Sequence, residues 1–77
     1  MAKKRVQERA VVVDRGDNVL QRAMDEVKHV SGFSVAMPIR ARLAGAAVEY
    51  EFLVADTQQE CEQALMNMRL DHELRNR

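Results

Sequence analysis

Two segments in which apolar residues alternate with polar ones constrain the fold of this chain most. They lie within residues 33–43 and 48–55, and a short Ala-Gly turn separates them. Alternation with a period of two is typical of half-buried strands that each keep one face in water. The pattern therefore predicts a β-hairpin over residues 33–55, which we expect to be the spine of the fold.

Charge predicts the register of this hairpin. A loop of four residues, 44–47, sets two arginines directly opposite two glutamates. The pairs are Arg40 with Glu51 and Arg42 with Glu49. A two-residue loop at positions 44 and 45 keeps only one such pair. Opposite charges that face each other across strands contribute a few tenths of a kcal/mol, up to about 1. We therefore expect the first register.

Pro38 lies inside the first of these strands and cannot donate a hydrogen bond to a neighbouring strand. Proline in a sheet is confined to edge strands, strand ends and bulges. The segment 33–43 is therefore expected to be an edge strand or to carry a bulge. If it is an edge, the remaining strand pairs antiparallel with residues 48–55.

The other elements follow from local patterns. Residues 6–13 are rich in valine and predict a strand. A helix is expected from Asp17 or Asn18, either of which could cap it, to a left-handed cap at Gly32. A second helix is expected from Thr57 to about Leu74, because Thr57-Gln-Gln-Glu matches a capping box.

The predicted fold class is therefore α+β with the order β-α-β-β-α. We expect a three-stranded, mainly antiparallel sheet with both helices packed on one face. At 77 residues the chain is expected to form a single small domain, 1–77, and we expect residues 1–5 to be a frayed basic N-terminus. Such a small core is marginal, and small domains often gain stability by forming oligomers.

The helix expected over residues 57–74 carries apolar side chains on two opposite sides. One side has its apolar residues between positions 61 and 68. The other has a row at every fourth residue, formed by Met66, Leu70 and Leu74. A few apolar residues on a surface helix need no explanation. The regular spacing and the small core favour instead a protein interface, and a second copy of the chain is the first choice of partner.

Catalytic, cofactor and metal sites find no support, and we expect no enzyme activity and no cofactor. The soft ligands His29, Cys61 and His72 match no zinc spacing, and no nucleophile motif or glycine-rich phosphate loop is present. A cysteine on the core side of a helix usually packs as a small hydrophobe. No segment is long and apolar enough to predict a membrane span.

Nucleic-acid binding is the alternative function. Twelve basic and twelve acidic residues cancel, so the net charge exerts no general attraction on nucleic acid. The candidate phosphate contacts are Lys3, Lys4, Arg5, Arg9, Arg40 and Arg42. RNA-binding sheets usually add aromatic residues that stack on bases. Here Phe33, Tyr50 and Phe52 fall on the expected core side, so this alternative is not favoured.

The sequence as a whole predicts a small regulatory protein that binds a larger protein partner and forms a homodimer through its second helix. A single cysteine without a disulfide partner fits the cytoplasm. The preference for arginine over lysine suggests a bacterial or phage gene, and such a small chain could inhibit a host protein.

Overall fold

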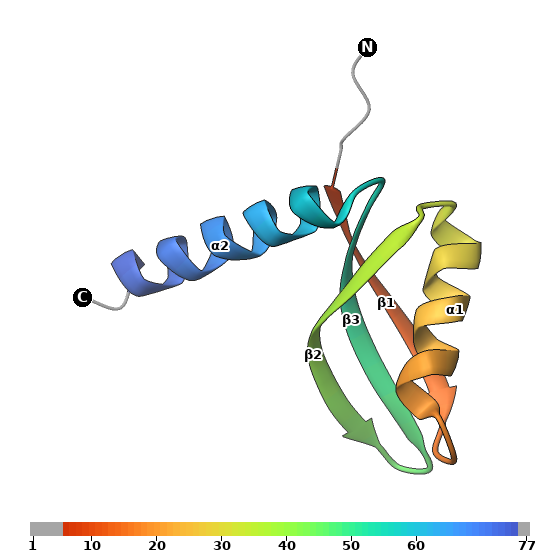
Figure 1. Cartoon of the computed structure of the whole chain (residues 1–77). Helices are drawn as coiled ribbons and strands as arrows, with labels where there is room; N and C mark the ends of the chain where they lie inside the picture. The colour runs from red at the N-terminus through yellow and green to blue at the C-terminus, as the bar shows by residue number, and fades with distance from the viewer. Residues whose placement is uncertain (1–5, 76–77) are drawn as a thin grey trace.

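The computed structural model of the protein describes residues 6–75. It contains five elements (Figure 1). They are β1 (Val6–Asp14), α1 (Val19–Ser31), β2 (Val35–Ala44), β3 (Ala47–Ala55) and α2 (Gln58–Arg75). The predicted α+β class and the order β-α-β-β-α are confirmed. The expected frayed terminus, residues 1–5, lies outside the described residues.

The three strands form an open sheet in the order β1-β3-β2, and both neighbouring pairs are antiparallel. β2 is thus an edge strand, as Pro38 predicted. The cross-strand partners of Arg40 and Arg42 are Glu51 and Glu49, which confirms the register expected from charge. The paired strands extend one residue further on each side than expected, so only residues 45 and 46 form the turn.

A bulge in β2 changes which side of the sheet its residues face. The register shifts between Pro38 and Arg40, and Ile39 is the additional residue. Met37 pairs with Leu53, whereas Ala41 pairs with Tyr50, which points to the other face. The expectation of one apolar side along the whole of residues 33–43 is therefore wrong, because the extra residue at the bulge inverts the alternation.

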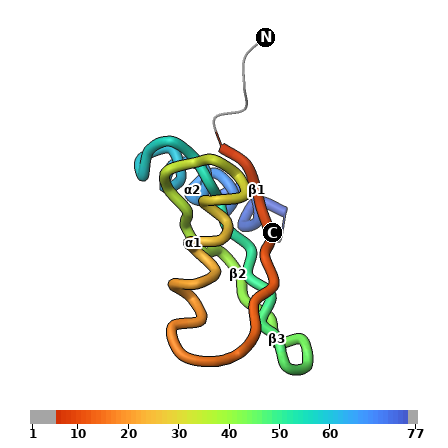
Figure 2. Tube along the Cα trace, turned by 90° about the vertical axis from the view of Figure 1, so that its right-hand side faces the viewer, coloured from red at the N-terminus to blue at the C-terminus, as the bar shows by residue number. Residues whose placement is uncertain are grey.

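The two helices lie on opposite faces of the sheet, so the expectation that both pack on one face is wrong. Phe52 packs in a cluster with Ala23 and Val27 of α1, whereas the next residue, Leu53, packs with Cys61 of α2. Successive residues of a strand point to opposite faces. The cause is the run Phe-Leu-Val-Ala at positions 52–55, which is buried on both faces. In Figure 2, α1 lies to the left and the C-terminal end of α2 to the right.

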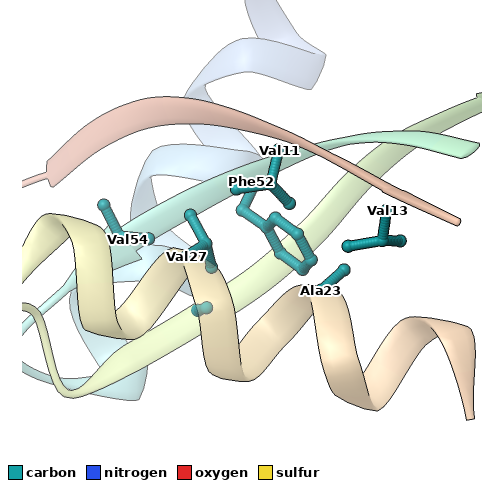
Figure 3. Close-up of a cluster of buried hydrophobic side chains, with 7 residues drawn as sticks. Val11, Val13, Ala23, Val27, Phe52 and Val54 are labelled. Atoms are coloured by element: carbon teal, nitrogen blue, oxygen red, sulfur yellow. The ribbon is translucent and has the colours of Figure 1, made fainter.

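The core on the α1 face is formed by aliphatic side chains around one aromatic ring (Figure 3). Its buried members are Val11, Val13, Ala23, Val27, Ala36, Phe52 and Val54. Phe52 and Val54 are fully buried and come from the central strand, so this core joins α1 to all three strands. Tyr50 packs at its margin with its ring centroid 5.9 Å from that of Phe52.

The ends of α1 differ in how well they were predicted. Gly32 is left-handed (φ 78°) and caps the C-terminus, as expected. At the other end Asn18 is itself left-handed, and its side chain makes no capping hydrogen bond. A capping side chain normally requires extended backbone at that position. The guanidinium of Arg22 instead donates to the backbone oxygens of Asp14 and Asp17, at 2.7 and 3.1 Å.

α2 begins where the capping box was predicted, but the Glu60 carboxylate accepts from the Thr57 hydroxyl and not from the Thr57 N–H, and the helix then extends away from the sheet (Figure 1). The N–H of Glu60 donates to Oγ1 of Thr57 at 3.2 Å, and the Thr57 hydroxyl donates to Oε1 of Glu60 at 2.9 Å. The first half of the helix packs on the sheet through the fully buried Cys61. Every residue from 69 to 75 is exposed, and Figure 1 shows these last turns projecting far from α1.

Candidate interaction surface

Three apolar side chains form a row along the outer side of α2. The relative exposure is 57% for Met66, 52% for Leu70 and 67% for Leu74. At 100° per residue this row lies on the side of the helix opposite Cys61, which faces the sheet. We call these three residues the α2 ridge. Their spacing and helical setting agree with the sequence pattern.

The projecting half of α2 has little to hold it in place within the described chain. Its last two turns are exposed on all sides, and the ion pair between Arg75 and Asp71, at 3.3 Å, lies in solvent. Exposed pairs of this kind contribute little to stability. Short helical segments are marginal in water without tertiary packing. A partner that covers the ridge would stabilise the part of α2 that the sheet leaves uncovered.

The polar residues around the α2 ridge suit the rim of an interface. Gln63 donates from Nε2 to Oδ1 of Asn67 at 3.2 Å, which places an amide pair beside the ridge. Arg69 and Glu73 lie on its other flank, and neither forms an ion pair within residues 6–75. Interfaces typically combine an apolar centre, depleted of charge, with a polar and charged rim.

An open groove of about 650 Å³ separates the inner side of α2 from the sheet. Its apolar walls come from Ile39, Leu65 and Met68. Charged side chains surround these walls. They are Glu8, Arg40, Arg69, Asp71, Glu73 and Arg75. Sequence reasoning missed this groove because it follows from α2 crossing the second face of the sheet. The apolar run at 52–55 was the signal that could have revealed it.

The residues considered for chemistry are not brought together. Cys61 is fully buried, and its thiol donates to the backbone oxygen of Leu53 at 3.5 Å. Burial raises the pKa of this thiol above its ordinary value, and the neighbouring Glu60 and Glu62 raise it further. A neutral, buried thiol is a poor nucleophile. Within residues 6–75 no three His, Cys, Asp or Glu side chains are grouped to hold a metal ion.

The basic residues of the alternative function lie on two different faces. Arg9 has the same orientation as Val11 and therefore belongs to the α1 face, where it donates to Oε1 of Gln7. Arg40 and Arg42 lie on the other face, where Arg40 also lines the groove beside α2. They form ion pairs with Glu51 and Glu49. Lys3, Lys4 and Arg5 lie outside the described residues.

The three aromatic residues of the chain are also on the face opposite the paired arginines. Phe52 is buried in the α1 core, and Phe33 and Tyr50 pack against that core. The face that carries Arg40 and Arg42 therefore has no aromatic side chain on which a base could stack. The α2 ridge, in contrast, lies wholly within the described residues, and its three members follow one another along one side of the helix.

In the described part of the chain, no helix combines the length and the apolar character needed to cross a membrane. No family model matches the chain, and no curated protein or solved structure is significantly similar to it.

Proposed function

We propose that this protein is a small, non-catalytic interaction protein that forms a homodimer through the α2 ridge and regulates a larger protein by binding it. The observation that carries this proposal is a regular apolar row on the exposed side of a helix that projects beyond its own sheet. Apolar patches rimmed by polar residues commonly mark protein interfaces. We further propose a cytoplasmic location, since the only cysteine is a free thiol, and a bacterial or phage origin.

The strength of the dimer follows from the size of the ridge. Fully burying a leucine or methionine side chain stabilises by about 1.5–3 kcal/mol, and these side chains still expose somewhat more than half of their surface. Six such side chains in a two-fold interface contribute roughly 5–11 kcal/mol in total. Association itself costs about 4–15 kcal/mol. We therefore expect a concentration-dependent dimer with a dissociation constant in the micromolar range or weaker.

Sedimentation equilibrium over a wide range of protein concentration tests the dimer. The mass should rise from the 8.8 kDa of one chain to twice that value. Leu70→Glu places a charge at the centre of the ridge and should keep the protein monomeric throughout. Leu43→Glu is the matched control, because Leu43 is 67% exposed but lies on β2. The proposed dimer is refuted if the wild-type protein is still monomeric at several hundred micromolar. It is also refuted if Leu43→Glu dissociates the dimer as fully as Leu70→Glu does.

Retention of a partner on immobilised protein tests the second part of the proposal. A protein that binds the wild-type chain and Leu43→Glu but not Leu70→Glu supports a regulatory role that depends on the α2 ridge. An apolar interface should withstand moderate salt. Binding to phosphates should instead weaken steeply as salt increases. Salt-sensitive binding that Leu70→Glu leaves intact would favour the nucleic-acid alternative.

A further inference from the structure

The outer edge of β1 has no strand beside it in the described chain. β1 pairs with β3 alone, and its register with β3 runs from Val6 to Asp14 without a bulge. The opposite edge of the sheet is different, because Pro38 and the bulge that follows it interrupt β2. Proline and bulges protect edge strands from pairing with a further strand. Of the two edges of the sheet, that of β1 is the continuous one.

The backbone of β1 turns every second residue toward this open edge. The N–H of Arg15 donates to the oxygen of Ala46, which lies opposite, so the odd-numbered residues form the hydrogen-bonded pairs with β3. The even-numbered residues therefore direct their N–H and C=O groups away from β3. Accordingly, the oxygen of Asp14 accepts from the Arg22 guanidinium at 2.7 Å. The outward backbone groups that make no hydrogen bond within the described chain are those of Glu8, Ala10 and Val12.

A pocket of about 600 Å³ lies along this edge, between β1 and α2. Four successive residues of β1, 6–9, line it, although only Val6 and Glu8 point to the α2 face. The pocket therefore reaches from that face round to the edge of the strand. Its apolar lining comes from Val6, Leu53, Ala64 and Met68.

Glu8 is the charged side chain that β1 directs to the side of this pocket. It has no hydrogen-bond or ion-pair partner among residues 6–75. Arg9 also lines the pocket, but it points to the α1 face and donates to Oε1 of Gln7. A basic side chain on a strand beside β1 would face Glu8 directly, as Arg42 faces Glu49 across β2 and β3.

We infer that the edge of β1 binds an extended segment of another protein, which joins the sheet as a fourth strand beside residues 6–10. Hydrogen bonds to alternate residues hold such a segment, and pockets for its alternate side chains give specificity. The side chains beside Val6, Glu8 and Ala10 point to the α2 face. The segment therefore carries a lysine or arginine beside Glu8 and apolar residues two positions to either side. The site lies apart from the α2 ridge and needs no dimer.

A second copy of β1 does not supply this segment. When two identical strands pair antiparallel in one continuous sheet, even-numbered residues of one copy lie opposite even-numbered residues of the other. The residue opposite Glu8 would then be a valine, an alanine or an acid, because β1 has no basic residue at an even position. Charge complementarity therefore favours a segment of a different protein.

Two synthetic peptides test the side-chain part of this inference. The probe is acetyl-Val-Thr-Lys-Thr-Val-amide, whose pattern is the same in both strand directions, and the control peptide replaces its lysine by glutamate. NMR titration of isotope-labelled protein should show that the probe binds about three- to ten-fold more tightly than the control and shifts the amide signals of Glu8 and Ala10. Glu8→Lys should reverse this preference. No binding of either peptide at millimolar concentration, or equal binding of both, overturns the inference.

Methylation of single peptide nitrogens tests the strand pairing itself. A strand turns only alternate N–H groups toward its neighbour. Methylating the nitrogen of the lysine and methylating that of the following threonine should therefore differ, with one abolishing binding and the other sparing it. If both methylated probes bind equally well, the peptide does not join the sheet and the inference is overturned.

Leu70→Glu separates this site from the proposed dimer. Leu70 lies about 160° around α2 from Met68, which lines the pocket. We expect this variant to bind the probe as the wild type does. Loss of probe binding by Leu70→Glu would overturn the placement of the site at β1. Probe binding by a wild-type chain that stays monomeric supports this inference and refutes only the dimer.

Discussion

Replacing Phe52 tests whether α1 and α2 occupy opposite faces of the sheet. Phe52 is fully buried in the cluster that includes Val27 of α1, whereas Met68 of α2 packs in the other cluster. If the two helices pack on opposite faces, a substitution at Phe52 should change the free-energy cost of a substitution at Val27 but not that of a substitution at Met68. Double-mutant cycles measure this coupling directly, and neighbours couple by 0.5–3 kcal/mol whereas separated sites add within about 0.5 kcal/mol.

The single changes must be mild, because a 77-residue domain has a free energy of unfolding of only about 4–12 kcal/mol. Phe52→Leu should cost about 1–1.5 kcal/mol. Val27→Ala removes two methyl groups, worth about 1.6 kcal/mol of transfer free energy. It also leaves a cavity that costs about 1 kcal/mol more. Met68→Ala should lower the free energy of unfolding by less than the same substitution at a fully buried site, since Met68 is only half-buried.

Urea unfolding followed by far-UV circular dichroism, at one fixed protein concentration, gives the four free energies of each cycle. We expect a coupling of about 0.5–1.5 kcal/mol between Phe52 and Val27, and less than about 0.5 kcal/mol between Phe52 and Met68. Equal couplings, or a larger one with Met68, would refute the assignment of the helices to opposite faces.

Two further predictions concern α2 itself. The pKa of the Cys61 thiol is raised above its ordinary 9.0 by burial and then by Glu60 and Glu62, so the unfolded chain loses this proton first as pH rises. The free energy of unfolding should therefore decrease as the pH rises above 9.0, and Cys61→Ala should remove that part of the decrease in urea titrations at several pH values. Thr57→Ala deletes the oxygen that accepts from the Glu60 N–H and should lower the free energy of unfolding by about 1 kcal/mol, whereas Thr57→Ser should retain most of it. A Thr57→Ala midpoint in urea equal to that of the wild type would contradict the role of the cap.

The strands and their register could be predicted from the sequence because the information is local. Alternation identified the hairpin, the arginine and glutamate pairs identified its register, and Pro38 identified the edge strand. The side on which α2 packs was not predicted, because it depends on the apolar run at 52–55 being buried on both faces. Pro38 indicated an edge strand or a bulge, and both occur. The residue at which the alternation inverts could not be predicted, because it depends on the pairing with the neighbouring strand.

The residues of the α2 ridge could be predicted from the sequence, but their surroundings could not. The spacing of Met66, Leu70 and Leu74 placed them on one side of a helix, and all three are exposed. The groove beside α2 could not be predicted, because it depends on where the helix crosses the sheet. The sequence also did not predict that Arg9 lies on one face of the sheet and Arg40 and Arg42 on the other. That placement depends on the register of all three strands and on the bulge in β2.

The double burial at residues 52–55 restricts how the length of this chain can vary in evolution. Removing one residue from β3 upstream of this run would turn Phe52 toward α2 and Leu53 toward α1. Each of the two cores would then contain side chains of the wrong size and shape for its packing. The turn at positions 45 and 46 is exposed and belongs to neither core, and it can lengthen without moving them. Homologous chains should therefore accept insertions at this turn and keep a constant number of residues from the bulge to the end of β2 and from the start of β3 to Ala55.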